Sequence, residues 1–212
     1  MSPPLLNSIG HRLSLLHGNN VVLSSSTMNP FPILFLNGTS SSGKTSAARA
    51  LQREWREPLL YVNNDAFIYM FSEATLKEKS NLPKVLPPIL SAFHQSLPFL
   101  AGCGFPMVVD AVIEDDRWMR ECVTKLAAHN VIFVGVHCPV DELDRRELAR
   151  GDRHVGFARW QFDHVHRFGS YDFELHTDHL SPEQCGQELA ALLRAGRQGT
   201  AFPRLRAHYS VS

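Results

Sequence analysis

Residues 38–45 read Gly38-Thr39-Ser40-Ser41-Ser42-Gly43-Lys44-Thr45, which fits the pattern G-x-x-x-x-G-K-[ST] at every fixed position. The run FPILFLN at residues 31–37 precedes this stretch, and its nearly continuous apolar character is typical of a buried parallel strand. A stretch with apolar residues spaced for one helix face follows it. A strand, a glycine-rich turn and a helix in this order predict a phosphate-binding loop.

The residue types of this loop suit a polyphosphate. Glycine lets the backbone approach phosphate closely because it has no Cβ. Successive N–H groups and the N-terminus of a helix present positive dipoles to an anion. In this pattern Lys44 reaches the β- and γ-phosphates, and the hydroxyl of Thr45 binds Mg²⁺. The alternative is a chance match in a Ser/Gly-rich turn, but most chance matches lack the strand and the helix that flank the loop here.

Four further apolar runs are predicted strands, at residues 59–63, 105–111, 131–136 and 172–176. Helical patterns separate them, which favours a parallel sheet with helices on both faces. The sequence therefore predicts an α/β three-layer fold of the P-loop kinase type with five parallel strands. Residues 66–104 look helical but broken, because Pro83, Pro87, Pro88 and Pro98 interrupt the pattern.

A length of 212 residues favours one domain over two. We place this domain at residues 30–196. Residues 1–29 are expected to form an extension outside the fold, with disorder or a weak local helix. Residues 197–212 contain few apolar positions and are expected to be a tail.

The composition limits the possible partners and the compartment. Lysine and arginine total 21, as do aspartate and glutamate, so no whole-chain field favours nucleic acid or an anionic membrane. No run approaches the ~20 apolar residues of a membrane span. The cysteines, which are Cys103, Cys122, Cys138 and Cys185, form no C-x-x-C pair. Scattered thiols of this kind are typical of a reducing compartment, so we expect a cytoplasmic protein.

Two aspartates follow predicted strands, and ligands of an open parallel sheet lie beyond the carboxyl ends of its strands. Asp65 comes just after residues 59–63, where a carboxylate can accept the proton of an alcohol. An aspartate at this place can equally be the N-cap of a helix. Asp110 ends an apolar strand in the Walker-B manner, where it helps to hold Mg²⁺, although a turn aspartate is the alternative.

Arginines gather in the segment DRRELARGDR at residues 144–153. Arg146, Arg150 and Arg153 are spaced by four and three, so they share one face if the helix continues. Such a face can close over phosphates as a lid and stabilise charge on the transferring group. The interleaved acidic residues also permit ordinary solvated ion pairs. A metal site built from the clustered histidines is disfavoured, because no cysteine or carboxylate set completes one.

These segments resemble a known family. The loop GTSSSGKT, the segment YVNNDAF, the strand FPMVVDAV and above all FVGVHCPVDELDRRELARGDRHVG are similar to chloramphenicol phosphotransferase and its relatives. The resemblance covers most of residues 31–195. It implies ATP and Mg²⁺ as cofactors and a hydroxyl of a small molecule as the acceptor. It also implies Asp65 as the catalytic base, Lys44 and Thr45 at the nucleotide, and Arg146, Arg150 and Arg153 in a lid.

The sequence therefore predicts an ATP-dependent O-phosphotransferase, with an antibiotic or a metabolite as the acceptor. One alternative is a P-loop kinase for a nucleotide, a sugar or an RNA 5′-hydroxyl. Another is a regulatory module that binds a nucleotide and transfers nothing. The regulatory module has no use for a catalytic base at Asp65, so this residue discriminates between the classes.

Overall fold

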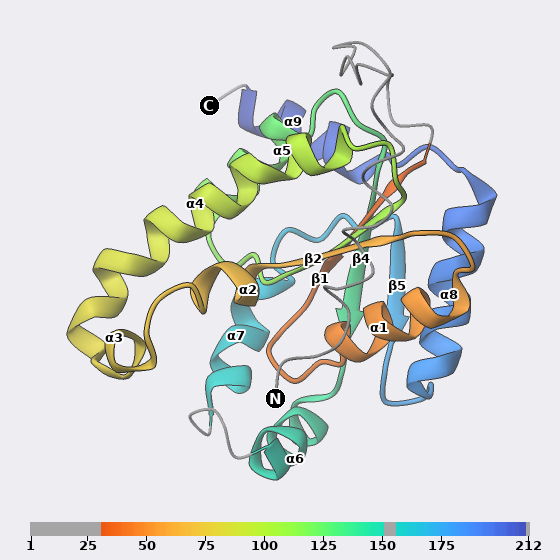
Figure 1. Ribbon diagram of the computed structural model, residues 1–212. Helices are drawn as coiled ribbons and strands as arrows, with labels where there is room; N and C mark the ends of the chain where they lie inside the picture. Colours follow the sequence, from red (N-terminus) through yellow and green to blue (C-terminus); the bar gives the residue numbers. More distant parts are fainter. Residues whose placement is uncertain (1–30, 151–155, 211–212) are drawn as a thin grey trace, which may run out of the picture.

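The computed structural model describes residues 31–150 and 156–210, and its strands form one parallel sheet in the order β2-β3-β1-β4-β5 (Figure 1). The strands are β1 (Ile33–Asn37), β2 (Leu60–Asn63), β3 (Met107–Ala111), β4 (Val131–His137) and β5 (Phe173–His176). The helices are α1 (Lys44–Glu54), α2 (Asn64–Ile68), α3 (Glu73–Lys77), η2 (Lys79–Asn81), α4 (Leu82–Ala101), α5 (Asp116–Lys125), α6 (Val140–Arg150), α7 (Phe157–Val165), α8 (Pro182–Ala195) and α9 (Ala201–Ser210). This arrangement confirms the predicted five-stranded α/β fold of the P-loop kinase type.

Helices cover both faces of the sheet, and strand β1 shows why its sequence is apolar throughout. Leu34 and Leu36 face the layer formed by α1 and α8. Ile33 and Phe35 face the layer formed by α4, α5 and α9. Successive side chains of a strand point to opposite faces, so a strand buried on both sides needs an unbroken apolar run.

Helix α4 differs from the sequence prediction. The sequence predicts a broken helical region at residues 66–104. This prediction is wrong for the longest helix of the region, because α4 continues from Leu82 to Ala101 through Pro87, Pro88 and Pro98. The buried residues Leu90, Phe93, Leu97 and Ala101 recur at helical spacing along it. A proline inside a helix costs about 3 kcal/mol, and we attribute the survival of the helix to the packing of this apolar face.

The C-terminal residues also differ from the prediction. The expected tail after residue 196 is wrong, because residues 201–210 form α9 against the sheet. The ring of Phe202 packs on Phe35 and Phe133, with centroid distances of 5.3 and 5.2 Å. Asp172 Oδ1 accepts the N–H groups of residues 200 and 201 at 2.7 and 3.0 Å and so caps the helix. A few well-placed apolar residues thus fix a segment that is polar on average.

Two expectations fall on parts of the chain outside the described residues, namely the extension at residues 1–29 and Arg153. Among the helices that are described, none is both long enough and apolar enough to cross a bilayer. The cysteines are free thiols, with Cys103 exposed and the other three buried.

Candidate active site

The loop at residues 38–43 joins the carboxyl end of β1 to the first turn of α1. Gly43 has a φ of 93°, in the left-handed region that favours glycine, and α1 begins at the next residue. The Lys44 Nζ donates to the carbonyl oxygens of Gly38 (2.9 Å) and Thr39 (2.7 Å). The loop therefore curls around its own lysine, while the first N–H groups of α1 have no partner within the helix.

Three hydroxyl groups of this loop are buried without a hydrogen-bond partner among the described residues. They are Thr39 Oγ1, Ser41 Oγ and Ser42 Oγ. Buried polar groups in folded proteins are almost always paired. A phosphate group brings several acceptor oxygens, so unpaired donors in a loop at a helix N-terminus fit a bound polyphosphate.

Thr45 and Asp110 meet beside the loop. Thr45 Oγ1 donates to Asp110 Oδ2 at 2.7 Å, and Lys44 Nζ lies 4.0 Å from Asp110 Oδ1. The parallel register explains the contact, because Asp110 of β3 is level with Leu36 of β1, two residues before the loop. No group of three or more His, Cys, Asp and Glu side chains in the described part of the chain could hold a metal. One carboxylate and one hydroxyl suit Mg²⁺, which keeps several waters and binds phosphate oxygens.

Tyr61 of β2 is a third member of this group, and the sequence analysis did not identify it. Its hydroxyl donates to Asp110 Oδ2 at 2.9 Å, and the guanidinium of Arg49 lies 4.1 Å from the centre of its ring. Burial, followed by the charge of Asp110, raises the pKa of Tyr61 well above its usual value, so the hydroxyl stays protonated. Tyr61 lies next to Asp110 because β2 pairs with β3, and the sequence pattern alone does not predict that pairing.

Asp65 lies in the first turn of α2, two residues after β2 ends. The N-cap of this helix is Asn63, whose side chain accepts the N–H of Ala66 at 2.7 Å. The alternative role of Asp65 as N-cap is therefore wrong. Because Asn63 pairs with Asp110 in the sheet, Asp65 belongs to the same carboxyl edge as the loop.

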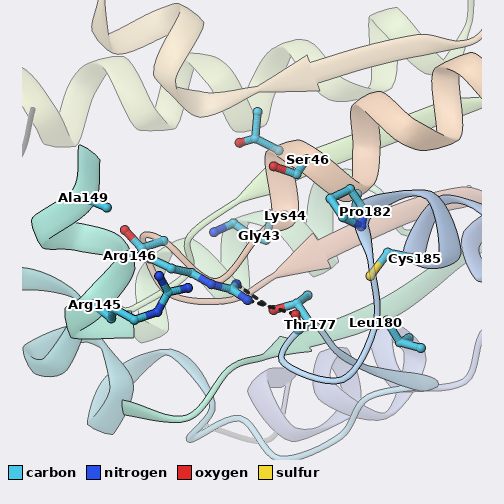
Figure 2. Close-up of a pocket in the computed structure, with 13 residues that line it drawn as sticks. Gly43, Lys44, Ser46, Arg145, Arg146, Ala149, Thr177, Leu180, Pro182 and Cys185 are labelled. Carbon is cyan, nitrogen blue, oxygen red and sulfur yellow. Dashed lines mark hydrogen bonds between the residues drawn. The ribbon is translucent and has the colours of Figure 1, made fainter. Parts of the chain in front are cut away.

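Of the three predicted lid arginines, the structure describes one side chain, that of Arg146. It donates to Thr177 Oγ1 (3.1 Å) and Thr177 O (2.9 Å) (Figure 2). It also pairs with Glu142 at 2.7 Å. A Cβ built on Gly43 would lie 3.4 Å from its Nη1, so the guanidinium lies against the loop. Arg150 ends α6 and its side chain is outside the described set, as is Arg153.

Glu142 is shared between two arginines. It accepts two hydrogen bonds from Arg145 (2.6 and 2.7 Å) and one from Arg146. These hydrogen bonds lower the pKa of Glu142 to about 2. The side chain of Arg145 is 70% exposed and that of Arg146 is 26% exposed, so the shared carboxylate holds Arg146 against the loop and leaves Arg145 largely in solvent.

A cavity of about 460 Å³ opens between the loop, α6 and the connection from β5 to α8 (Figure 2). It is lined by Ser41, Gly43, Lys44, Thr45, Ser46, Ala47, Arg145, Arg146, Ala149, Thr177, Leu180, Pro182 and Cys185. The sequence analysis missed Thr177, Leu180 and Cys185. The run Ser181-Pro182-Glu183-Gln184 has the pattern of a capping box, and the structure has this capping box, which fixes where α8 begins.

A buried glutamine ties helix α7 to the loop. Gln161 Oε1 accepts the N–H of Ser40 at 2.7 Å, and its Nε2 donates to Glu114 at 3.0 Å. Burial raises the pKa of Glu114. The contact joins residues 121 positions apart in the chain, so no local pattern predicts it.

Three imidazole rings stack at the carboxyl edge of the sheet. His137 lies between His166 and His176, with ring centroids 4.2 and 5.1 Å away. The Nδ1 of His166 shares a hydrogen bond of 2.8 Å with the hydroxyl of Tyr171, which also accepts from Asn37 Nδ2 at 3.0 Å. Asn37 is the last residue before the loop. The same asparagine therefore holds the tyrosine that bonds to the histidine stack and leads directly into the loop.

Comparisons with known proteins identify the family of this chain. The chloramphenicol phosphotransferase-like protein family matches residues 32–194. A Mycobacterium tuberculosis protein named as a candidate O-phosphotransferase is 30% identical over 203 residues, and the match covers 84% of this chain and 88% of that protein.

Solved structures of P-loop kinases share the fold. The adenylylsulfate (APS) kinase of Mycobacterium tuberculosis superposes with a TM-score of 0.58 at 21% identity, covering 77% of this chain and 97% of the kinase. The tunicamycin resistance protein of Deinococcus radiodurans gives 0.58 at 19% identity, covering 80% and 98%. The shikimate kinase of Acinetobacter baumannii gives 0.55 at 14% identity, covering 80% and 96%. These likenesses show a P-loop kinase fold, and the family match over residues 32–194 with the 30% identical relative shows that this chain, a phosphotransferase, belongs to the chloramphenicol phosphotransferase-like protein family.

Proposed function

We propose that this chain transfers the γ-phosphoryl group of ATP to a hydroxyl of a small molecule. The observation that carries the proposal is the contact between Thr45 and Asp110 next to Lys44, since Lys44 and Thr45 also line the cavity. Phosphoryl transfer depends mainly on positioning and on electrostatic stabilisation. A phosphate-binding loop, a cation and a metal-binding pair in one place supply both.

Each residue has a proposed role. The N–H groups of the loop and Lys44 bind the phosphates, and Thr45 and Asp110 hold Mg²⁺, which when bound neutralises charge on the phosphate oxygens. Arg146, with Arg150 and Arg153 as proposed lid partners, offsets negative charge that develops on the transferring group. Asp65 accepts the proton of the acceptor hydroxyl. At the same time the oxygen of that hydroxyl bonds to the γ-phosphorus, and the bond from this phosphorus to the leaving ADP breaks.

The proposed acceptor is a small alcohol, either an antibiotic or a metabolite. The equal numbers of basic and acidic residues support a small molecule over RNA. Free thiols together with the use of ATP support a cytoplasmic location.

Two substitutions test the proposal with labelled ATP and a panel of small alcohols. Lys44→Ala removes the phosphate cation, and we expect kcat/KM to fall by about 100-fold or more. Asp65→Asn keeps the shape and removes the base, and we expect kcat to fall by about 100-fold while nucleotide affinity is unchanged. Lys77→Ala and Asp163→Asn change exposed residues of the same types and serve as matched controls.

The outcomes separate the alternatives. Undiminished transfer by Asp65→Asn would remove this residue from catalysis and leave the loop assignment intact. Nucleotide binding without transfer to any alcohol would instead favour a regulatory module. Transfer to a nucleotide, a sugar or an RNA end in the same panel would identify a different kinase.

A further inference from the structure

A second cavity of about 460 Å³ lies on the face of the molecule that carries α5 and α9. It is lined by Asp116, Arg167, Phe168, Ser170, Arg204, Leu205, His208 and Tyr209. None of these residues lines the cavity at the phosphate-binding loop. The second cavity therefore has its own walls, built from the start of α5, the segment that precedes β5, and α9.

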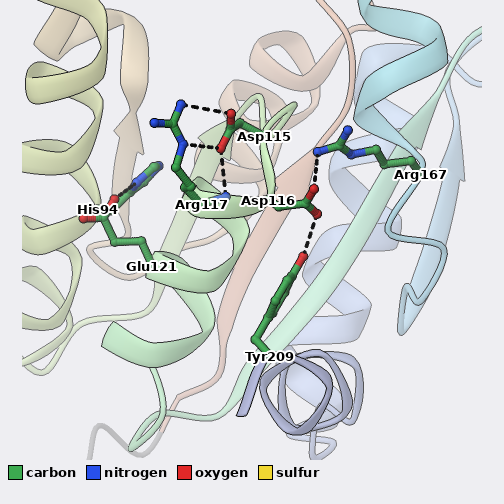
Figure 3. Close-up of polar contacts among 7 residues, drawn as sticks. All are labelled: His94, Asp115, Asp116, Arg117, Glu121, Arg167 and Tyr209. Carbon is green, nitrogen blue, oxygen red and sulfur yellow. Dashed lines mark hydrogen bonds and ion pairs between the residues drawn. The ribbon is translucent and has the colours of Figure 1, made fainter. Parts of the chain in front are cut away.

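The acidic residue of this cavity is already occupied by two donors. Arg167 Nη2 donates to Asp116 Oδ2 at 2.9 Å, and the hydroxyl of Tyr209 donates to Asp116 Oδ1 at 3.0 Å (Figure 3). Figure 3 shows the two donors reaching the carboxylate from different elements. Asp116 thus orients Arg167 and Tyr209 at the rim and neutralises one positive charge.

The second arginine of the cavity has no such counterion. Arg204 is exposed, and within residues 31–150 and 156–210 its guanidinium has no hydrogen-bond or ionic partner. It lies one helical turn from His208, so both side chains are on the same face of α9. The guanidinium of Arg120 adds positive charge nearby, 5.3 Å from the centre of the Tyr209 ring. The lining therefore carries excess positive charge, although the chain as a whole is neutral.

Two apolar side chains, Phe168 and Leu205, also line this cavity, together with Ser170, His208 and Tyr209. The side chain of Leu205 in α9 is buried. The guanidinium of Arg167 lies 5.1 Å from the centre of the Phe168 ring. A cavity with an arginine that has no counterion among the described residues, and with an aromatic ring in its wall, suits a ligand with an anionic group on a flat or apolar body.

We propose that this cavity is a second binding site, distinct from the phosphate-binding loop, for a small organic anion with a phosphate or carboxylate group. Arg204 and Arg167 bind the anionic group, and Phe168 with Leu205 contacts the body of the ligand. The proposal does not depend on the transfer reaction proposed above.

Titration calorimetry with phenyl phosphate and benzoate tests the site and separates the two anionic groups. The loop is first filled with a non-hydrolysable ATP analogue and Mg²⁺, because the loop also attracts phosphate. Benzyl alcohol is the control ligand, since it keeps the ring and lacks the charge. We expect one of the two anions to bind the wild-type chain and benzyl alcohol not to bind.

Arg204→Ala is expected to weaken binding of that anion by about tenfold or more, because it removes a charge-assisted hydrogen bond. Arg206→Ala is the matched control on the same helix, since Arg206 points to Ala127 O at 3.2 Å instead. Arg204→Lys keeps the charge and should restore part of the affinity, which separates loss of charge from misfolding. Failure of both anions to bind at about 10 mM, or equal affinity of the Arg204→Ala and Arg206→Ala variants, would overturn the proposal.

Discussion

At the scale of single residues, the hydroxyl of Tyr61 decides how Asp110 is held. Asp110 Oδ2 accepts from Thr45 at 2.7 Å and from Tyr61 at 2.9 Å, which leaves Oδ1 on the side of Lys44. Groups that orient a metal-binding carboxylate commonly change metal affinity when they are removed. Tyr61 is therefore a positioning residue for the proposed Mg²⁺ site.

Tyr61→Phe removes this hydroxyl and little else. We expect the concentration of Mg²⁺ that supports binding of an ATP analogue to rise by about tenfold. The measurement is a fluorescence titration of the analogue at several Mg²⁺ concentrations. Tyr69→Phe, at an exposed tyrosine, should leave the Mg²⁺ dependence unchanged. An unchanged dependence in Tyr61→Phe as well would mean that the hydroxyl only fills space.

The histidine stack predicts an effect of pH on stability. Burial, and then the charges of His137 and Lys44, lowers the pKa of His166 to about 4. The unfolded chain has a histidine pKa of about 6.5 and therefore binds more protons between these two values. Stability is fully present above about pH 6.5, falls as the pH falls towards about 4, and then levels off. After allowance for solvent screening, we expect the protonation of His166 to lower the free energy of unfolding by about 1–2 kcal/mol over this pH range.

Urea denaturation at pH 7, 6 and 5 measures this contribution. His166→Gln should reduce the loss of unfolding free energy between pH 7 and 5, whatever it does to stability at pH 7. His179→Gln changes an exposed histidine and should keep the wild-type slope. If His166→Gln also keeps that slope, the imidazole is not the titrating group.

At the scale of elements, α9 is part of the core that covers the sheet. Phe202 packs on Phe35 and Phe133 and is 4% exposed. Truncation of a buried phenylalanine typically costs about 3–5 kcal/mol, because apolar contacts are lost and a cavity remains. We expect Phe202→Ala to lower the free energy of unfolding by that amount in denaturant titration.

Phe99→Ala is the matched control for this substitution. Phe99 is 82% exposed on α4, so its removal should change the free energy of unfolding by about 0.5 kcal/mol or less. Equal effects of the two substitutions would show that α9 contributes little to stability and would restore the interpretation of residues 197–212 as a tail.

The sequence predicts best those elements whose cause is local. The loop at residues 38–45 and the apolar runs of β1 and β4 carry their structure in their own pattern, and they appear where predicted. The break in α4 and the tail at α9 are wrong, because tertiary packing outweighs propensity in both.

The residues of the candidate site also divide into those that a local sequence pattern predicts and those that tertiary packing brings together. Lys44 and Thr45 follow from the loop pattern, and Asp110 follows from its place at the end of a strand. Tyr61 and Gln161 contact the loop group only because distant elements pack together. No periodicity records such contacts, so the sequence could not identify them.

At the scale of the whole molecule, the cavity at the phosphate-binding loop joins parts of the chain that the fold brings together. Its walls come from residues 41–47, from α6 and from the connection before α8. A ligand that binds only the native state stabilises it by RT ln(1 + c/Kd), where c is the ligand concentration, and this is about 2.7 kcal/mol at a concentration 100 times its Kd. Nucleotide binding should therefore raise the melting temperature of the entire domain.

Two neighbouring arginines show whether this stabilisation passes through α6. Arg146 contacts Thr177 across the cavity, whereas Arg145, which also lines the cavity, is 70% exposed and bonds only to the shared carboxylate among the described residues. We expect Arg146→Ala to weaken binding of an ATP analogue about tenfold, which removes about 1.4 kcal/mol of the ligand-induced stabilisation. Arg145→Ala should keep most of the ligand-induced stabilisation. Each variant is compared by thermal denaturation with and without the analogue, so differences in stability without the ligand cancel. A shift in Arg146→Ala as large as that in Arg145→Ala would mean that α6 borders the cavity without binding the nucleotide.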